Sequence, residues 1–311
     1  MNSLIVLSGP TAVGKSSLAV KLAQKISGSI ISADSMQVYR GMDIGTAKIT
    51  KSEMEDIPHY LIDIMDPHED FNIVTFQTLA KDAIKSIHDK GRIPIIVGGT
   101  GFYIQSVIYD IDFTEGDELT DFRKELTDLF NEEGGNTLHD MLKKVDPKAA
   151  EHIHPNDMKR LIRALEYNAQ TGGAISDHNN SSRMKESPYD LCYFVLTDNR
   201  QKIYERINER VDKMIEDGLV DEVRHLMDMG LSKENVSMHG IGYKEIIDHI
   251  NGVTSLDEAV YIIKRESRHF AKRQLTWFRR EKNVCWLDLE KDENILDTMI
   301  NELKAKGIIN E

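Results

Sequence analysis

Gly9-Pro-Thr-Ala-Val-Gly-Lys-Ser16 decides the fold, because it matches the G-x-x-x-x-G-K-[ST] pattern of phosphate-binding loops. The apolar run Leu4–Leu7 before it predicts a buried strand, and apolar residues at helical spacing predict a helix over 17–26 after it. In such a strand–loop–helix unit, backbone N–H groups at the helix N-terminus point at a bound anion. The side chain of Lys15 would neutralise phosphate oxygens, and the Ser16 hydroxyl would bind Mg²⁺. The residues predicted to hold a phosphorylated compound are Gly9, Pro10, Thr11, Ala12, Val13, Gly14, Lys15 and Ser16.

The composition limits what the whole chain can be. Its 311 residues, 40% of them apolar, can bury a sizeable core and suit one or two domains. Cys192 and Cys285 lie in apolar, strand-like runs, which favours reduced core thiols and a cytoplasmic location over a disulfide bridge. No apolar run approaches the length of a membrane span, and the N-terminus lacks the pattern of a cleavable signal. We therefore expect no membrane association.

Charge is unevenly distributed along the chain. The net charge of −13 argues, taken alone, against a polyanionic partner. Residues 264–282, however, contain eight Lys or Arg and two Glu, which gives this segment a net charge of +6. Because local charge decides whether a surface can bind a nucleic acid, this segment is a candidate for phosphate contacts.

Strand and helix patterns alternate over 1–111, which predicts a P-loop NTPase-like parallel α/β sheet flanked by helices. Residues 112–188 are charged and helical in pattern, so we interpret them as a helical insertion domain between 1–111 and 189–311. Within the insertion, 176–188 is predicted as a loop, and later in the chain 257–281 is predicted as one long basic helix or a helix pair. The strands predicted after the first are 29–32, 59–64, 93–97, 191–196 and 284–287.

Two polar residues follow predicted strands as the phosphate-binding loop does. Asp34 follows the strand at 29–32, and Thr100 follows the strand at 93–97 and two glycines. Because the carboxyl ends of neighbouring parallel strands face one crevice, these side chains should meet near the phosphate. Asp34 could be associated with Mg²⁺, could cap the next turn, or could be a general base, since its carboxylate is ionised at neutral pH. Thr100 could be a helix N-cap.

The block Asp34-Ser-Met-Gln-Val-Tyr-Arg-Gly-Met-Asp-Ile-Gly-Thr-Ala-Lys48 resembles the signature of the tRNA dimethylallyltransferases, also called tRNA isopentenyltransferases. This block alone is highly specific, and the matches run in order from residue 9 to about residue 280. Eukaryotic members of this family carry a C-terminal zinc-finger extension. The sequence shows no such extension and so resembles the bacterial form. The other matching segments are Pro58–Asp63, Gly98–Tyr103, Asn156–Glu166, Gly240–Lys244 and Lys272–Arg279.

The resemblance implies transfer of a dimethylallyl group from dimethylallyl diphosphate to N6 of the adenine 3′ of the tRNA anticodon, with release of pyrophosphate. Asp34 would then be the base that takes the N6 proton, and Thr100 would hydrogen-bond the substrate. Lys15, with Mg²⁺ on Ser16, would stabilise the leaving pyrophosphate. The resemblance also places Arg210 on the pyrophosphate, although a solvated helix face is the ordinary setting of such an arginine.

The resemblance further implies contacts with the anticodon arm of tRNA. The charged residues among them could, on the sequence alone, form ordinary solvated helix faces. Trp277 and Phe278 could stack on bases or lie in the core, and the target adenine would have to leave its stack to react. The predicted tRNA-binding residues are Asp34, Ser35, Met36, Gln37, Thr100, Arg123, Lys159, Arg160, Leu161, Ile162, Arg163, Gly242, Tyr243, Lys244, Lys272, Arg273, Gln274 and Arg279.

Three other functions compete with tRNA prenylation. A small-molecule kinase would share the phosphate-binding loop and Mg²⁺ but would consume ATP. An adenylate isopentenyltransferase would act on free nucleotides and would not need the basic segment 264–282 or the helix with Arg160 and Arg163. A nucleotide-gated RNA-binding switch would respond to ATP or GTP and would tolerate the loss of Asp34. Nothing in the sequence resembles a dimer seam, so we expect a monomer.

Overall fold

The chain divides into two compact units, which we call the core unit and the insertion unit. The core unit consists of Met1–Ile108 and Ser187–Glu311, and the insertion unit is Tyr109–Glu186. No helix among the described residues is both long enough and apolar enough to cross a membrane. The structure, a computed structural model, describes residues 2–113, 120–178 and 185–310.

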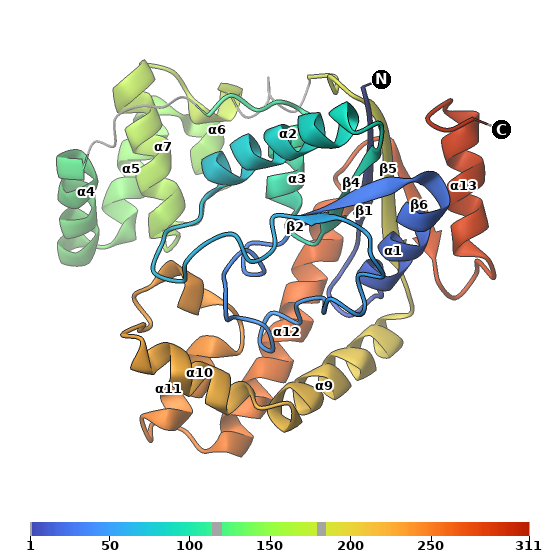
Figure 1. Cartoon of the computed structure of the whole chain (residues 1–311). Helices are drawn as coiled ribbons and strands as arrows, with labels where there is room; N and C mark the ends of the chain where they lie inside the picture. The colour runs from blue at the N-terminus through green and yellow to red at the C-terminus, as the bar shows by residue number, and fades with distance from the viewer. Residues whose placement is uncertain (1, 114–119, 179–184, 311) are drawn as a thin grey trace. The chain divides into compact units, whose positions relative to one another are not determined.

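The core unit is built on a six-stranded sheet within the described residues, and all its strands run parallel (Figure 1). The strand order is β3-β2-β4-β1-β5-β6, so β1 lies in the interior of the sheet between β4 and β5. This arrangement confirms the predicted parallel α/β core. The strands are β1 (Ser3–Ser8), β2 (Gly28–Ala33), β3 (His59–Tyr60), β4 (Ile93–Gly98), β5 (Asp190–Thr197) and β6 (Val284–Asp288).

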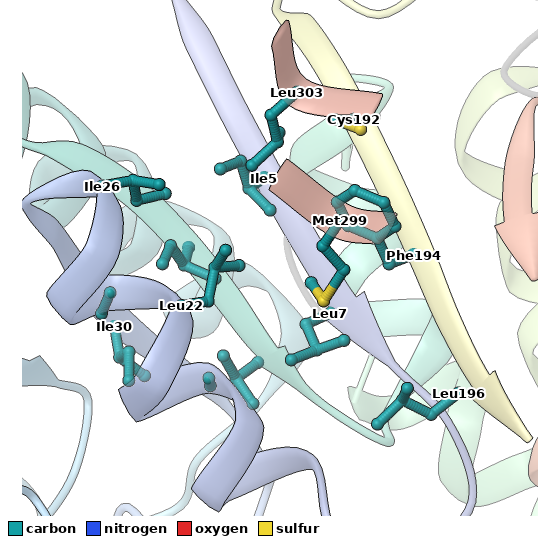
Figure 2. Close-up of a cluster of buried hydrophobic side chains, with 14 of the residues drawn as sticks. Ile5, Leu7, Leu22, Ile26, Ile30, Cys192, Phe194, Leu196, Met299 and Leu303 are labelled. Atoms are coloured by element: carbon teal, nitrogen blue, oxygen red, sulfur yellow. The ribbon is translucent and has the colours of Figure 1, made fainter. Parts of the chain in front are cut away.

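One face of the sheet packs on α1 (Lys15–Ile26) and α13 (Ile295–Ala305), as Figure 2 shows. Side chains alternate between the two faces of a strand, so Ile5 and Leu7 of β1 point to the same side. They meet Leu22 of α1 in a fully buried apolar cluster, which also contains a free cysteine of β5. Burying one side chain of this size contributes about 1.5–3 kcal/mol, so this cluster fixes the loop between β1 and α1.

Two further helices, α2 (Ile73–Asp89) and α3 (Gly101–Ile108), pack against β4 and against each other. Asn72 caps α2, because its side chain accepts the N–H groups of the first turn. The ring of Phe76 stacks on that of Tyr103, with centroids 4.6 Å apart. These contacts fix the position of the start of α3, which follows the carboxyl end of β4.

The second half of the core unit is mainly helical. Residues 257–281 contain a single long helix, α12, not a helix pair. Ser255 caps it by accepting the N–H of Glu258, and no Gly or Pro interrupts it before it ends at Phe278. The helices of this half are α9 (Arg200–Glu216), α10 (Leu219–Asp228), the 3₁₀ helix η1 (Val236–His239), α11 (Tyr243–Ile250) and α12 (Leu256–Phe278).

The insertion unit is helical, as predicted. Asp157 caps α7, and Gly172 ends it in the left-handed conformation with φ 68°. The apolar sides of the helices meet in one cluster that includes Leu126, Leu138 and Leu161. Its main helices are α4 (Thr120–Glu133), α5 (Gly135–Val145), α6 (Pro147–Ala150) and α7 (Met158–Thr171).

Two expectations about local structure are wrong. The strand predicted at 59–64 ends at Tyr60, because Leu61 and Asp63 adopt positive φ values of 63° and 54° instead of extended ones. In the loop predicted at 176–188, residues up to 178 are helical, and 179–184 lie outside the described residues.

Candidate active site

Three loops of the core unit begin at the same edge of the sheet. Ser8 of β1 and Ala33 of β2 are both register partners of Gly98 of β4. A Cβ atom on Gly98 would lie 2.2 Å from the carbonyl oxygen of Ala33, so only glycine permits this approach. The phosphate-binding loop, the loop that begins with Asp34 and the turn that contains Thr100 therefore leave the sheet side by side, as expected for a crevice at the strand ends.

The phosphate-binding loop has the predicted strand–loop–helix setting. Gly14 lies in the left-handed region, with φ 93°, immediately before α1. The Nζ of Lys15 donates to the carbonyl oxygens of Gly9, at 3.0 Å, and Pro10, at 2.7 Å. The Ser16 side chain is exposed in the first turn of α1. The loop thus presents an ammonium group, a hydroxyl group and a helix N-terminus, which together suit an anion.

Three charged side chains lie close to one another beside the phosphate-binding loop, and they are those of Lys15, Asp34 and Arg210. Burial, assisted by the positive charge of Arg210, lowers the pKa of Lys15 to about 7, while the negative charge of Asp34 acts in the opposite direction. Arg210 comes from α9, and its Nη1 lies 3.5 Å from the hydroxyl of Thr11, to which it donates. The fold therefore brings together the predicted Lys15, Asp34 and Arg210.

A pocket of about 340 Å³ opens between the loop and α9. Arg210 and Lys213 lie one helical turn apart and both line it, which suits phosphate oxygens. Arg206 lines it too and pairs with the buried carboxylate of Asp198. Sequence reasoning missed Lys213, although its spacing from Arg210 was a usable signal. The lining residues are Ala12, Gly14, Arg206, Glu209, Arg210 and Lys213.

Asp34 caps the turn that follows β2. Its Oδ1 accepts the N–H of Met36 at 2.9 Å and that of Gln37 at 3.4 Å. Among the described residues, no hydrogen bond to Oδ2 is observed. The capping role and a role as base are therefore compatible, because each can use a different oxygen of the half-buried carboxylate.

Thr100 directly precedes α3, and its carbonyl oxygen accepts the N–H groups of Tyr103 and Ile104. The next residue, Gly101, lies against Trp277, since a Cβ there would be 2.2 Å from the indole ring. Trp277 also makes an edge contact with Phe102, with ring centroids 6.1 Å apart. The indole therefore packs against the turn that contains Thr100.

Gln274 of α12 joins the two glycine-rich turns. Its Oε1 accepts the N–H of Thr11 at 2.8 Å, and its Nε2 donates to the carbonyl oxygen of Gly99 at 3.0 Å. The side chain is only 6% exposed. Both the oxygen and the nitrogen of the Gln274 amide thus hydrogen-bond within the protein. The sequence did not suggest this bridging role.

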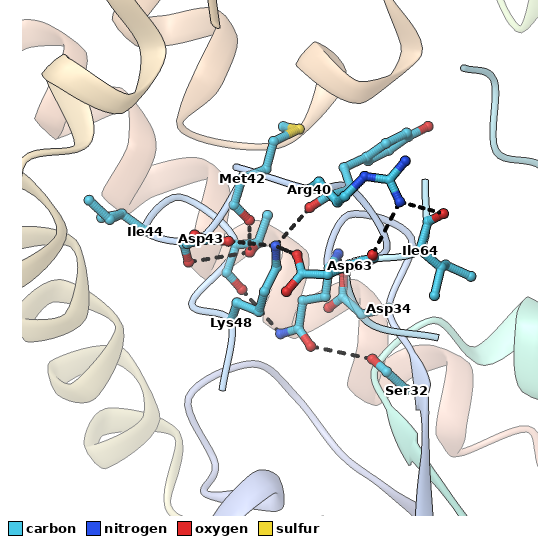
Figure 3. Close-up of polar contacts among 12 residues, drawn as sticks. Ser32, Asp34, Arg40, Met42, Asp43, Ile44, Lys48, Asp63 and Ile64 are labelled. Atoms are coloured by element: carbon cyan, nitrogen blue, oxygen red, sulfur yellow. Dashed lines mark hydrogen bonds and ion pairs between the residues drawn. The ribbon is translucent and has the colours of Figure 1, made fainter. Parts of the chain in front are cut away.

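The block 34–48 is folded on itself by two long polar side chains (Figure 3). The nearly buried Nζ of Lys48 donates to the carbonyl oxygen of Tyr39 and to the carboxylates of Asp43 and Asp63. Gln37 accepts a hydrogen bond from Ser32 at 3.3 Å and donates to the carbonyl oxygen of Thr46 at 3.2 Å. These contacts hold the block together and connect it to Ser32 and Asp63.

The predicted tRNA-binding residues fall into three groups by exposure. Leu161, Ile162, Tyr243 and Gln274 have buried side chains, which contradicts a direct contact of these side chains with tRNA. They pack in the cores of their units because each lies on the inner side of its helix. Gly242 is buried with its neighbour, and Asp34, Ser35, Met36, Gln37 and Thr100 are half-buried. The exposed residues are Arg123, Lys159, Arg160, Arg163, Lys244, Lys272, Arg273 and Arg279.

Arg123 has a partner within the insertion unit. Its Nε and Nη2 donate to the two carboxylate oxygens of Glu166, at 2.8 and 2.7 Å. The Glu166 side chain is 8% exposed, so the guanidinium compensates a buried charge. The structure thus gives Arg123 a structural role that competes with the predicted tRNA contact.

Comparison with known proteins identifies the family. The model of the IPP transferase family matches residues 37–281. The chain belongs to this family. The tRNA dimethylallyltransferase of Lachnoclostridium phytofermentans is 57% identical to this chain, over 99% of this chain and 100% of the relative. That of Carboxydothermus hydrogenoformans is 51% identical, over 98% of this chain and 99% of the relative.

Solved structures of the IPP transferase family also match. The full-length tRNA isopentenylpyrophosphate transferase of Bacillus halodurans is 46% identical, with a TM-score of 0.74 and 99% of each chain covered. A eukaryotic dimethylallyltransferase acting on tRNA is 30% identical, with a TM-score of 0.85 over 99% of this chain and 80% of the other. The resemblance inferred from the 34–48 block is therefore confirmed.

Proposed function

We propose that this enzyme transfers the dimethylallyl group of dimethylallyl diphosphate to N6 of the adenine 3′ of the tRNA anticodon and releases pyrophosphate. The observation that carries this proposal is the convergence of Asp34, Lys15 and Arg210 beside the phosphate-binding loop. Membership of the IPP transferase family and the names of the similar proteins support it. The three residues supply the two things that the reaction needs, a base and a positively charged site for the leaving group.

Asp34 would act on the adenine. The exocyclic amine is a weak nucleophile, because its lone pair is delocalised into the ring. As the new C–N bond forms, the amine loses a proton, and the carboxylate oxygen not used for capping can accept it. Thr100, which follows the neighbouring strand β4, would hydrogen-bond the same substrate.

The phosphate-binding loop would act on the diphosphate. The allylic C–O bond breaks and leaves negative charge on the pyrophosphate, which the amides of the loop can stabilise. Arg210 and Lys213 line the adjoining pocket and add positive charge. Lys15 at present donates to two carbonyl oxygens of the loop and would turn to the phosphate when it binds.

The residues of the site fit a Mg²⁺ ion whose ligands come mainly from the substrate. The described residues contain no group of three or more His, Cys, Asp or Glu side chains that could hold a metal alone. The exposed hydroxyl of Ser16 offers one oxygen, and Mg²⁺ is commonly held by one or two protein oxygens with phosphates and waters. When bound, the ion would neutralise charge on the pyrophosphate.

The exposed cations are the residues we propose to contact the phosphates of the anticodon arm. On the insertion unit they are Lys159, Arg160 and Arg163, and on the core unit they include Lys272 and Arg279. Phosphate contacts of this kind position the nucleic acid without reading its sequence. The target adenine would leave its stack to reach Asp34.

The test is incubation with undermodified tRNA, labelled dimethylallyl diphosphate and Mg²⁺, followed by nucleoside analysis. We expect label on the adenosine beside the anticodon, with no need for ATP. Labelling of free adenosine monophosphate but not of tRNA would indicate an adenylate isopentenyltransferase. ATP hydrolysis without prenyl transfer would indicate a kinase.

A further inference from the structure

Glu222 of α10 binds the backbone of the 34–48 block. Its Oε2 accepts the N–H groups of Asp43, at 2.8 Å, and Ile44, at 2.7 Å, and its Oε1 accepts that of Gly45 at 3.0 Å. Three successive N–H groups that converge in this way form an anion-binding nest. The nest is filled by a carboxylate from a helix far along the chain.

Tyr243 of α11 donates a fourth hydrogen bond to this carboxylate. Its hydroxyl lies 2.8 Å from Oε1 of Glu222, and its side chain is fully buried. Burial, together with the carboxylate of Glu222, raises the pKa of Tyr243 well above its ordinary value, so the hydroxyl stays a donor. Gly45 lies against the same ring, because a Cβ there would be 2.6 Å from it. The nest therefore contacts both α10, through Glu222, and α11, through Tyr243.

The nest is connected to Asp34 by hydrogen bonds within the block. Gln37 donates to the carbonyl oxygen of Thr46, the residue that follows the nest. The N–H groups of Met36 and Gln37 in turn hold Oδ1 of Asp34. A displacement of residues 43–46 would thus be passed through Gln37 to the carboxylate.

We propose that Glu222 is a positioning residue, which fixes the 34–48 block and so holds the Asp34 carboxylate in place for proton transfer. This inference rests on the proposed function, in which Asp34 is the base. A carboxylate is needed because four donors converge on it, whereas the amide of glutamine has one accepting oxygen and two donors of its own.

The experiment compares Glu222→Gln with Asp221→Asn, a matched control. Asp221 lies on the same helix, its side chain is 82% exposed, and its substitution removes the same charge. With Glu222→Gln we expect the single-turnover rate of prenyl transfer at saturating substrates to fall about 30-fold, since small displacements of a catalytic group are costly. The Kd of dimethylallyl diphosphate should change less than about threefold, because its loop is not part of this chain of contacts. Asp221→Asn should match the wild type.

Hydrogen exchange keeps the proposal testable if the rate alone is ambiguous. In Glu222→Gln, the amides at 36–37 and 43–45 should exchange faster, while those of the phosphate-binding loop keep their protection. Faster exchange with a normal rate would overturn the positioning role. Equal loss of protection throughout the core unit would also overturn it, because it would show a general loss of stability.

A double variant tests whether Glu222 acts through Asp34. Adding Glu222→Gln to Asp34→Asn should slow the residual reaction by less than about threefold. A further 30-fold loss would mean that Glu222 acts independently, which overturns the inference but leaves the proposed function standing. A normal rate for Asp34→Asn alone would overturn both, since Asp34 would then not be the base.

Discussion

Asp34 is the residue on which the proposed chemistry depends. One of its carboxylate oxygens accepts two backbone N–H groups of the turn that follows, and the other is left for a substrate. The side chain therefore has a structural role besides the chemical role that we propose, and a suitable substitution can separate the two.

Asp34→Asn should remove the chemical role and keep the structural one. The amide oxygen of asparagine can still accept the N–H of Met36, but the amide cannot accept a proton at neutral pH. We expect turnover to fall by about 10²–10⁴-fold, measured with labelled dimethylallyl diphosphate, while the affinity for tRNA and the unfolding temperature stay close to wild type. A rate within twofold of wild type would rule out Asp34 as the base.

Lys15 should take up a proton when pyrophosphate binds. Its pKa of about 7 means that at pH 8 the free side chain is mostly neutral. A bound anion raises the pKa, so the side chain becomes protonated, and the affinity for pyrophosphate should fall as the pH rises above 7. Calorimetry at pH 8, in buffers of different ionisation enthalpy, should show a larger proton uptake by the wild type than by Lys15→Met.

The control for this experiment is Lys21→Met, which removes an exposed lysine from the same helix. It should take up as many protons as the wild type. Equal uptake by the wild type and Lys15→Met would show that Lys15 does not change its protonation state on binding.

At the scale of elements, the site depends on helices that hold loops by single side chains. The phosphate-binding loop and the turn after β4 are both tied to α12 through Gln274. The 34–48 block is tied to α10 through Glu222. Each of these two side chains satisfies backbone groups that would otherwise lose their partners.

Gln274→Ala should loosen the phosphate-binding loop. The substitution leaves the N–H of Thr11 and the carbonyl oxygen of Gly99 without their partner, which costs about 1–3 kcal/mol of unfolding free energy. Urea unfolding measures this loss, and equilibrium binding should show weaker pyrophosphate affinity. Lys272→Ala, an exposed position on the same helix, should leave both quantities unchanged. If Gln274→Ala also leaves them unchanged, the bridge does not support the loop.

At the scale of the whole molecule, an acidic protein has to bind a polyanion. The net charge is −13, so binding depends on where the exposed cations gather. Part of the basic segment of α12 is neutralised within the chain, since Lys264 pairs with Asp212 and Arg265 with Glu266. On α7, Arg160 likewise pairs with Asp157, so the exposed cations of α7 and of α12 both contribute to the tRNA contacts that we propose.

Arg160→Gln with Arg163→Gln should weaken tRNA binding. Both side chains are exposed on α7. Removing two phosphate contacts should lower the slope of log K against log salt by about 1–2, so the loss of affinity is largest at low salt. Filter binding over a range of salt concentrations measures the slope. Lys143→Gln with Lys144→Gln, the same charge change on α5, is the control, and equal slopes for the two double variants would argue against a specific surface.

The predicted part of the site consists of residues in continuous motifs. The phosphate-binding loop, Asp34 and Thr100 follow predicted strands directly, so the parallel sheet brings them together at one edge. Glu222 could not be predicted in this way, because a single glutamate in an amphipathic helix resembles any solvated carboxylate. The burial of Ile162 was hidden for a related reason, since a family segment does not say which of its residues face inward.

The class of the fold could be predicted from the sequence, because strands and helices follow from local hydrophobic periodicity. The family could be predicted because the 34–48 block is contiguous. Only the tertiary structure decided the strand order, the extent of β3 and the partners of the loop backbones. The physical reason is that a backbone N–H can donate to any suitably placed acceptor, whatever the distance of that acceptor along the chain. Glu222 and Gln274 meet their loops only once the sheet and its helices have packed.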